Sequence, residues 1–179
     1  MTDTRSCRER EHHREYECYL GKDQQEWLKK TLKESTAPFK IISSGTMWSD
    51  YMSKAKDSWG TWDKEAREEI FSFIEKENIP DVFLISGNRH GARSFTIPIQ
   101  SGKSFYEFEA ASLGGVSGPE ALAEDHSIQL FGYQGPDVIA FGEFTFDTKK
   151  DTPLATFRLI DEHGNTREEY ELPYNKLVH

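Results

Sequence analysis

Cysteine is scarce in this 179-residue chain, in which Cys7 and Cys18 are the only two. Two cysteines are too few for a disulfide scaffold, and their spacing is not that of a CxxC motif, so we interpret them as isolated thiols. The alternative is that they bind zinc together with His12 and His13, although this spacing matches no common zinc pattern.

Long apolar runs are also missing. No stretch approaches the roughly 18 to 20 apolar residues that a membrane-spanning helix needs. Polar residues follow Met1, where a signal peptide would have its apolar region. We therefore expect a chain that does not cross a membrane and is not exported, with the cytoplasm as its default location.

Positive charge is in short supply. The chain has 22 Lys and Arg against 31 Asp and Glu, a formal net charge of -9. Binding to phosphate backbones needs clustered basic side chains, so we expect no nucleic-acid partner.

Aromatic residues, in contrast, are plentiful, with 12 Phe, 7 Tyr and 4 Trp available to fill a core. The length, without any internal repeat or linker, predicts one domain over residues 1–179.

The first half of the chain is typical of helices that alternate with buried strands. Residues 20–35 predict an amphipathic helix whose apolar face carries Leu20, Trp27, Leu28, Thr31 and Leu32. FKIISS at 39–44 and DVFLIS at 81–86 are typical of buried strands, and residues 63–78 predict a second helix, capped by Asp63. Strand, helix and strand in this order predict two parallel strands in one sheet, and hence an α/β fold.

Beyond residue 90 the pattern changes to strand after strand. The runs are SFTIPI at 94–99, SFYEFEA at 104–110, SIQLFGY at 127–133, VIAFGEFTF at 138–146, LATFRLI at 154–160 and REEYEL at 167–172. Turn residues separate these runs, and DEHGN at 161–165 is a favourable hairpin turn. We therefore expect this half to be largely antiparallel.

Two short motifs follow the two predicted parallel strands, SSGT at 43–46 and SGNRHG at 86–91. In open α/β sheets, ligands bind at the carboxyl ends of the strands. The imidazole of His90 and the amide oxygen of Asn88 can ligate a metal, and Arg89 between them can bind a phosphate through two hydrogen bonds. From these residues alone, a purely structural turn is an equally acceptable interpretation.

Two other segments also have both a structural and a functional interpretation. At the start of the chain, Asp3, Arg5 and Arg8 could contribute to a site, but we favour a frayed, charged terminus. Residues 46–62 hold three of the four tryptophans without a sustained period, which indicates a long loop. Its aromatic side chains could line a pocket, but we favour packing of the loop onto the domain.

Five segments of the sequence together resemble one known family. They are DTRSCR at 3–8, LGKDQQEWLKKTLKES at 20–35, APFKIISSGTMWSD at 37–50, DSWGTWDKEAREEIFSFIEKENIPDVFLISGNRH at 57–90 and FYEFEAASL at 105–113. In this order they resemble the carboxyl-terminal half of the PhoD-like metallophosphatases, the alkaline phosphatase D group of the calcineurin-like phosphoesterases. The resemblance covers nearly all of the chain, and the order and spacing of the segments make it specific.

The resemblance implies a four-layered α/β sandwich around a dinuclear metal centre that hydrolyses phosphate monoesters or diesters. In such centres the metal ions polarise phosphoryl oxygens and lower the pKa of a bound water, which attacks the phosphorus. His90 matches a metal-ligating histidine of the family, and Asn88 stands where the family usually has aspartate. Arg89 and Arg5 are implied to bind phosphate. The metals would be divalent or trivalent ions, with iron, calcium, zinc and manganese as candidates.

The family segments that supply its other ligands, of the D-x-H, G-D and G-N-H types, have no counterpart in this sequence. We therefore expect the chain to be incomplete or inactive as a phosphoric ester hydrolase when it is alone. A sheet with two parallel strands would also have an uncovered edge and an uncovered apolar face, which calls for a missing amino-terminal half or a second copy as partner. The alternative function is a noncatalytic interaction module with the same fold.

Overall fold

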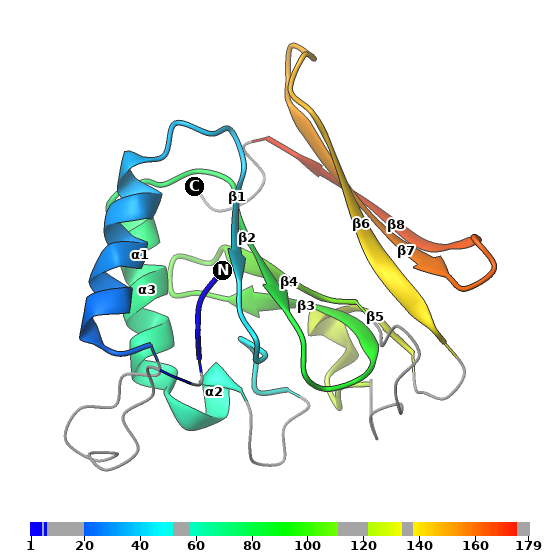
Figure 1. Cartoon of the computed structure of the whole chain (residues 1–179), viewed down its shortest axis with the longest axis horizontal. Coiled ribbons are helices and arrows are strands. Elements are labelled where there is room, and N and C mark those ends of the chain that lie inside the picture. The colour runs from blue at the N-terminus through cyan, green and yellow to red at the C-terminus, as the bar shows by residue number, and fades with distance from the viewer. Residues whose placement is uncertain (5, 7–19, 52–57, 111–121, 134–137, 175–179) are drawn as a thin grey trace.

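Three layers make up the fold, which a computed structural model of the chain shows. Two helices form the first layer, a five-stranded mixed sheet the second and a three-stranded antiparallel sheet the third (Figure 1). The structure describes residues 1–4, 6, 20–51, 58–110, 122–133 and 138–174. No helix in these ranges is long and apolar enough to cross a membrane.

The order of elements along the chain agrees with the sequence pattern. They are α1 (Lys22–Glu34), β1 (Lys40–Ser43), α2 (Trp59–Trp62), α3 (Lys64–Lys76), β2 (Val82–Ser86), β3 (Ala92–Pro98), β4 (Ser104–Glu109), the 3-10 helix η1 (His126–Ile128), β5 (Gln129–Tyr133), β6 (Ala140–Asp147), β7 (Leu154–Asp161) and β8 (Thr166–Pro173). Both long helices and all the strands predicted from the sequence are present. The predicted hairpin turn joins β7 to β8, where Gly164 adopts a φ of 83° that other residues rarely tolerate.

The two long helices pack on one face of the mixed sheet. α1 buries Leu28 and Leu32, whereas Trp27, which we expected on the same apolar face, is 50% exposed. α3 begins as predicted, because the Asp63 carboxylate accepts a hydrogen bond from the Ala66 N–H at 3.1 Å. The cap satisfies one of the backbone donors that the first turn of a helix leaves without an intrahelical partner.

The mixed sheet has the strand order β1-β2-β4-β3-β5. β1 and β2 are parallel, as predicted, and β4 adds a third parallel strand on the other side of β2. The pairs β3–β4 and β3–β5 are antiparallel, so the expectation of a largely antiparallel second half is confirmed for them. Because β4 lies between β2 and β3, the connection from β2 to β3 has to pass over the end of β4.

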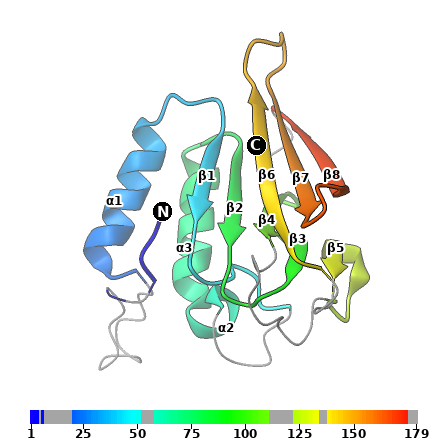
Figure 2. The ribbon, with the colours of Figure 1, turned by 45° about the vertical axis from the view of Figure 1, so that its right-hand side comes forward.

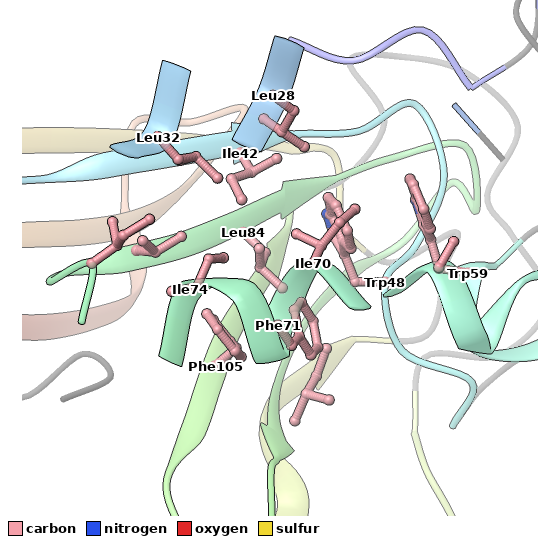
Figure 3. Close-up of a cluster of buried hydrophobic side chains, with 14 of the residues drawn as sticks. Leu28, Leu32, Ile42, Trp48, Trp59, Ile70, Phe71, Ile74, Leu84 and Phe105 are labelled. Carbon is pink, nitrogen blue, oxygen red and sulfur yellow. The ribbon is translucent and has the colours of Figure 1, made fainter. Parts of the chain in front are cut away.

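One hydrophobic core lies between the helices and the mixed sheet. Its members come from α1, α3, the strands and residues 46–51 and 58–62, which we call the tryptophan segment. Those labelled in Figure 3 are Leu28, Leu32, Ile42, Trp48, Trp59, Ile70, Phe71, Ile74, Leu84 and Phe105. All of these side chains are buried. Burial of this apolar area, at roughly 25 cal/mol per Å², is what fixes the helices on the sheet.

A second core lies between the mixed sheet and the antiparallel sheet β6-β7-β8 (Figure 2). Phe83 of β2, Phe108 of β4 and Phe157 of β7 are at most 1% exposed, and the rings of Phe108 and Phe157 have centroids 4.3 Å apart. Our expectation of an uncovered apolar face is therefore wrong for most of the mixed sheet. The exception is its β1 side, where Ile41 remains 39% exposed.

Candidate functional site at the carboxyl ends of the parallel strands

Residues 87–91, which we call the candidate loop, connect β2 to β3 at the carboxyl ends of the parallel strands, as the sequence predicted. Asn88 and His90 both have positive φ, 78° and 51°, and both are exposed to solvent. Asparagine and histidine tolerate this left-handed region better than most residues. Gly91 is required for a different reason, since a Cβ there would lie 2.0 Å from Nη2 of Arg93.

A buried ion pair holds this connection in place. The Arg89 N–H donates to Oε1 of Glu109 at 2.8 Å, and Nη2 of Arg93 donates to the Arg89 carbonyl at 3.2 Å. Nε of Arg93 lies 2.9 Å from Oε2 of Glu109, and the two side chains are 1% and 2% exposed. Both backbone polar groups of Arg89 are thus bonded to the pair, which fixes where the neighbouring Asn88 and His90 project.

The electrostatics of the pair follow from its burial. Removal from water disfavours both charged forms, so burial raises the pKa of Glu109 to about 7, although the Arg93 charge and the Arg89 N–H act in the opposite direction. Burial also lowers the pKa of Arg93, and the charge of Glu109 opposes this effect. Glu109 is therefore a carboxyl group that titrates near neutral pH directly beneath the candidate loop.

The other motif, SSGT after β1, is occupied by structural hydrogen bonds. The Ser44 hydroxyl accepts from the Thr46 N–H at 3.2 Å and from the indole N–H of Trp59 at 3.1 Å. These bonds close the turn after β1 and attach it to α2. Within the described residues, this motif therefore has a role in holding the chain together.

The start of the chain runs beside the end of β1. The Thr2 N–H donates to the Ser43 carbonyl at 2.8 Å, and the Asp3 N–H donates to Oε1 of Gln24 on α1 at 2.7 Å. Thr2 and Thr4 are 3% and 2% exposed. Our expectation of a frayed terminus is wrong for these residues, whereas Arg5 and Arg8 lie outside the described residues.

The tryptophan segment is packed, as favoured from the sequence. Trp48 and Trp59 are fully buried and stacked, with ring centroids 4.6 Å apart and an interplanar angle of 6°. The buried carboxylate of Glu107 accepts hydrogen bonds from the Trp48 and Ser49 N–H groups at 2.7 and 3.0 Å. Arg67 of α3 donates to the Trp48 carbonyl at 2.8 Å. Part of the expected loop is the short helix α2.

The donor set for a metal is of the right kind but too small. Asn88 and His90 offer an amide oxygen and an imidazole nitrogen from one loop, and both donor types ligate metals. The residues that the structure describes contain no group of three or more His, Cys, Asp or Glu that could hold a metal ion. The nearby Glu109 already binds Arg93 and the Arg89 N–H. The described residues thus do not form a complete metal centre, and the proposed zinc site of Cys7, His12, His13 and Cys18 lies outside them.

Sequence reasoning missed the two residues that hold the loop, Arg93 and Glu109. Glu109 lies on a predicted strand and Arg93 directly precedes another, but their partnership depends on the register of β3 against β4, in which Arg93 is opposite Glu109. The available signal was a charged residue within one apolar run and another directly before a second run, since such charges are normally paired when they are buried.

The molecule is an α/β protein whose candidate loop lies where α/β sheets bind their ligands. The family model described as PhoD-like phosphatase matches residues 1–145, and the chain belongs to this family. The chain is similar to alkaline phosphatase D of Bacillus subtilis (strain 168), with 27% identity over 107 residues, which cover 55% of this chain and 18% of the relative.

The fold is similar to that of a solved structure of PhoD. The TM-score is 0.54 at 17% sequence identity, and the match covers 89% of this chain but 37% of the other. The chain therefore spans well under half of the length of both relatives.

Proposed function

We propose that this chain contributes one side of the site of a PhoD-like phosphoric ester hydrolase, which acts on phosphate monoesters or diesters. In this proposal His90 and Asn88 ligate a metal ion, and Arg89 binds a phosphate group of the substrate. Arg5 is a second phosphate-binding residue. The family match to residues 1–145 supports this class of activity, and it does not favour the noncatalytic alternative.

The proposal rests on where residues 87–91 lie and on the hydrogen bonds that hold them there. The loop lies over the carboxyl ends of β2 and β4, and the buried pair of Arg93 and Glu109 bonds to both backbone groups of Arg89. A side chain that binds substrate has to be supported by a rigid part of the protein, and the buried ion pair provides this support for the loop. The guanidinium of Arg89 provides paired N–H donors that match phosphate oxygens.

The remaining ligands have to come from a part of a PhoD-like fold that this chain does not cover. Catalytic metal sites commonly use three protein ligands, whereas the described residues offer two candidates, one of them a neutral amide. We therefore propose that the chain alone binds metal weakly and does not turn over substrate. The partner is the missing part of the fold or, as a second possibility, another copy of the chain.

The ligand roles are tested on the isolated chain by measuring its metal content by mass spectrometry after dialysis against manganese, iron, zinc or calcium. We expect Asn88→Asp to strengthen binding of at least one metal by about tenfold, because a carboxylate adds a negative charge to the ligand set. His90→Ala, added to Asn88→Asp, should abolish the gain. His163→Ala, which removes an exposed histidine from the turn between β7 and β8, is the matched control when it is added to Asn88→Asp in the same way. Equal metal content in the wild type, Asn88→Asp and the two double variants contradicts the ligand roles.

The activity is tested after co-expression with the part of Bacillus subtilis alkaline phosphatase D that precedes its segment similar to this chain. Hydrolysis of a chromogenic phosphomonoester and a phosphodiester is measured for the complex and for the chain alone. We expect turnover by the complex, loss of turnover in His90→Ala and no loss in His163→Ala. A purified complex without turnover would refute the proposed function, and turnover by the isolated chain would refute its incompleteness.

A further inference from the structure

The candidate loop offers a metal ion two neutral ligands and no negative charge. The proposed ligands, the Asn88 amide oxygen and the His90 imidazole, are both uncharged when they bind a metal. Arg89 between them gives residues 87–91 their one formal charge, which is positive. The affinity of a site for a hard cation depends on how many negative charges its ligands carry. The loop alone therefore attracts a metal ion only weakly.

The carboxylates beneath the loop are already in use. Glu107 and Glu109 lie two residues apart on β4 and thus on the same face of the strand, and both are at most 1% exposed. Glu107 accepts two backbone N–H groups of the tryptophan segment, and Glu109 binds Arg93 and the Arg89 N–H. If either carboxylate turned to a metal on the loop, it would leave buried donors without their partners.

The charge of Arg89 extends to this buried pair. Burial is the largest influence on both members, since it raises the pKa of Glu109 and lowers that of Arg93. The charge of Arg89 also acts on both, and it lowers the pKa of each. The charges of Glu109 and Arg93 offset each other, so the pair does not cancel the positive charge of the loop. That charge repels a cation and attracts an anion.

A phosphate group on Arg89 supplies what the loop lacks. It brings negative charge, and two of its oxygens can accept hydrogen bonds from one guanidinium. A further oxygen can ligate a metal ion, as substrate phosphates commonly do. Arg89 lies directly between Asn88 and His90 in the chain. An anion on the guanidinium and a cation on the two neighbouring side chains are therefore bound by the same five-residue loop.

We propose that metal and phosphate bind to the candidate loop cooperatively, so that the phosphate group of the substrate supplies the negative charge that Asn88 does not. This proposal rests on the ligand roles of the proposed function. By thermodynamic linkage, phosphate raises the affinity for the metal by the same factor as the metal raises the affinity for phosphate. The cooperativity follows from the asparagine, because an aspartate at position 88 would supply a negative charge before any phosphate binds.

The test is equilibrium dialysis of the isolated chain with Mn²⁺ and inorganic phosphate, which requires no activity. Bound Mn²⁺ is measured by mass spectrometry with and without phosphate, and bound radioactive phosphate is measured with and without Mn²⁺. Chambers without protein correct for complexes that the two ions form in solution. We expect saturating phosphate to raise the affinity for Mn²⁺ by about tenfold, and saturating Mn²⁺ to raise the affinity for phosphate by the same factor.

Two variants separate the charges of the loop. Arg89→Gln should bind Mn²⁺ at least as tightly as the wild type without phosphate, and phosphate should no longer raise this affinity. Asn88→Asp should bind Mn²⁺ more tightly without phosphate, and phosphate should then add less than about threefold. Arg167→Gln is the matched control, because it removes a partly exposed arginine from β8 and should keep the full cooperativity.

The outcomes distinguish this proposal from the ligand roles on which it rests. If phosphate leaves the affinity for Mn²⁺ unchanged while His90→Ala still lowers it, the cooperativity is refuted and the ligand roles stand. Cooperativity that persists in Arg89→Gln also overturns the proposal, since the phosphate is then held elsewhere. If no protein binds Mn²⁺ with or without phosphate, the ligand roles and the cooperativity are both refuted.

Discussion

At the scale of single residues, the ion pair of Arg93 and Glu109 decides the shape of the candidate loop. A buried charge pair seldom adds much stability, since the loss of hydration offsets most of the attraction. Its effect here is geometric, because the same two side chains bind the N–H and the carbonyl of Arg89. An apolar pair of similar size could fill the space but could not orient the loop.

The raised pKa of Glu109 gives a pH dependence with a defined sign. Its pKa is about 7 in the folded chain, against an ordinary value of 4.5. Between these two values the folded state holds a proton that the unfolded chain has released. The free energy of unfolding therefore falls as the pH rises from about 4.5 to 7, by up to about 3 kcal/mol from this group. Below and above this window, Glu109 contributes no slope.

Urea denaturation of the wild type and of Glu109→Gln at several pH values between 5 and 8 measures this contribution. The glutamine variant cannot lose the proton, whereas the other titrating groups are common to both proteins. We expect the difference in unfolding free energy between wild type and variant to shift in favour of the variant as the pH rises. A difference that stays constant over this range would show that Glu109 is ionised throughout.

At the scale of the elements, the tryptophan segment is attached to the sheet by one carboxylate. Glu107 is fully buried on β4 and accepts from the Trp48 and Ser49 N–H groups. Glu107→Ala would leave two buried backbone donors without these partners, at a cost of about 1–3 kcal/mol each. We expect the free energy of unfolding to fall by about 2–5 kcal/mol, together with a change in the near-UV circular dichroism of the stacked Trp48 and Trp59.

Glu107→Gln is the matched variant for this prediction. Its amide oxygen can still accept one of the two hydrogen bonds, so it should lose about half as much stability and keep most of the near-UV signal. Equal stability of wild type and Glu107→Ala would mean that stacking and burial of the two indoles hold the segment without the carboxylate.

The elements also show what the sequence could and could not predict. Local patterns were sufficient for α1, α3 and the strands, because burial of one face imposes a period on each of them. Trp27 was misplaced because it is adjacent to Leu28 and so lies about 100° away from the stripe of Leu28 and Leu32. Alternation along β4 could not reveal that it is parallel to β2, since strand direction depends on how the chain connects the strands.

The site was predicted in the same uneven way. The positions of Asn88, Arg89 and His90 at the end of a strand could be predicted from the run of apolar residues before them. The support beneath them could not, because the contact of Glu109 with Arg89 spans 20 residues and exists only once β4 has inserted between β2 and β3. Contacts of that kind follow from topology, which short-range periodicity does not contain.

At the scale of the whole molecule, the two cores share the mixed sheet, and this predicts that all three layers unfold together. Phe83 and Leu84 are adjacent on β2 and face opposite cores. Neither outer layer can lose its packing without exposing one face of the strands that the other layer needs. The chain should therefore behave as the single domain that its length and sequence predict.

Substitution of Phe157 tests this coupling, because the tryptophans report from the opposite side of the molecule. Phe157 lies on β7 and is 1% exposed, whereas Trp48 and Trp59 belong to the core beneath the helices and Trp27 lies on α1. Phe157→Ala should lower the free energy of unfolding by about 3–5 kcal/mol. In a cooperative domain, tryptophan fluorescence and far-UV circular dichroism then shift to the same lower denaturant midpoint. If β6–β8 instead unfolded independently, the tryptophan transition would stay at its wild-type position, since no tryptophan contacts that sheet's own core.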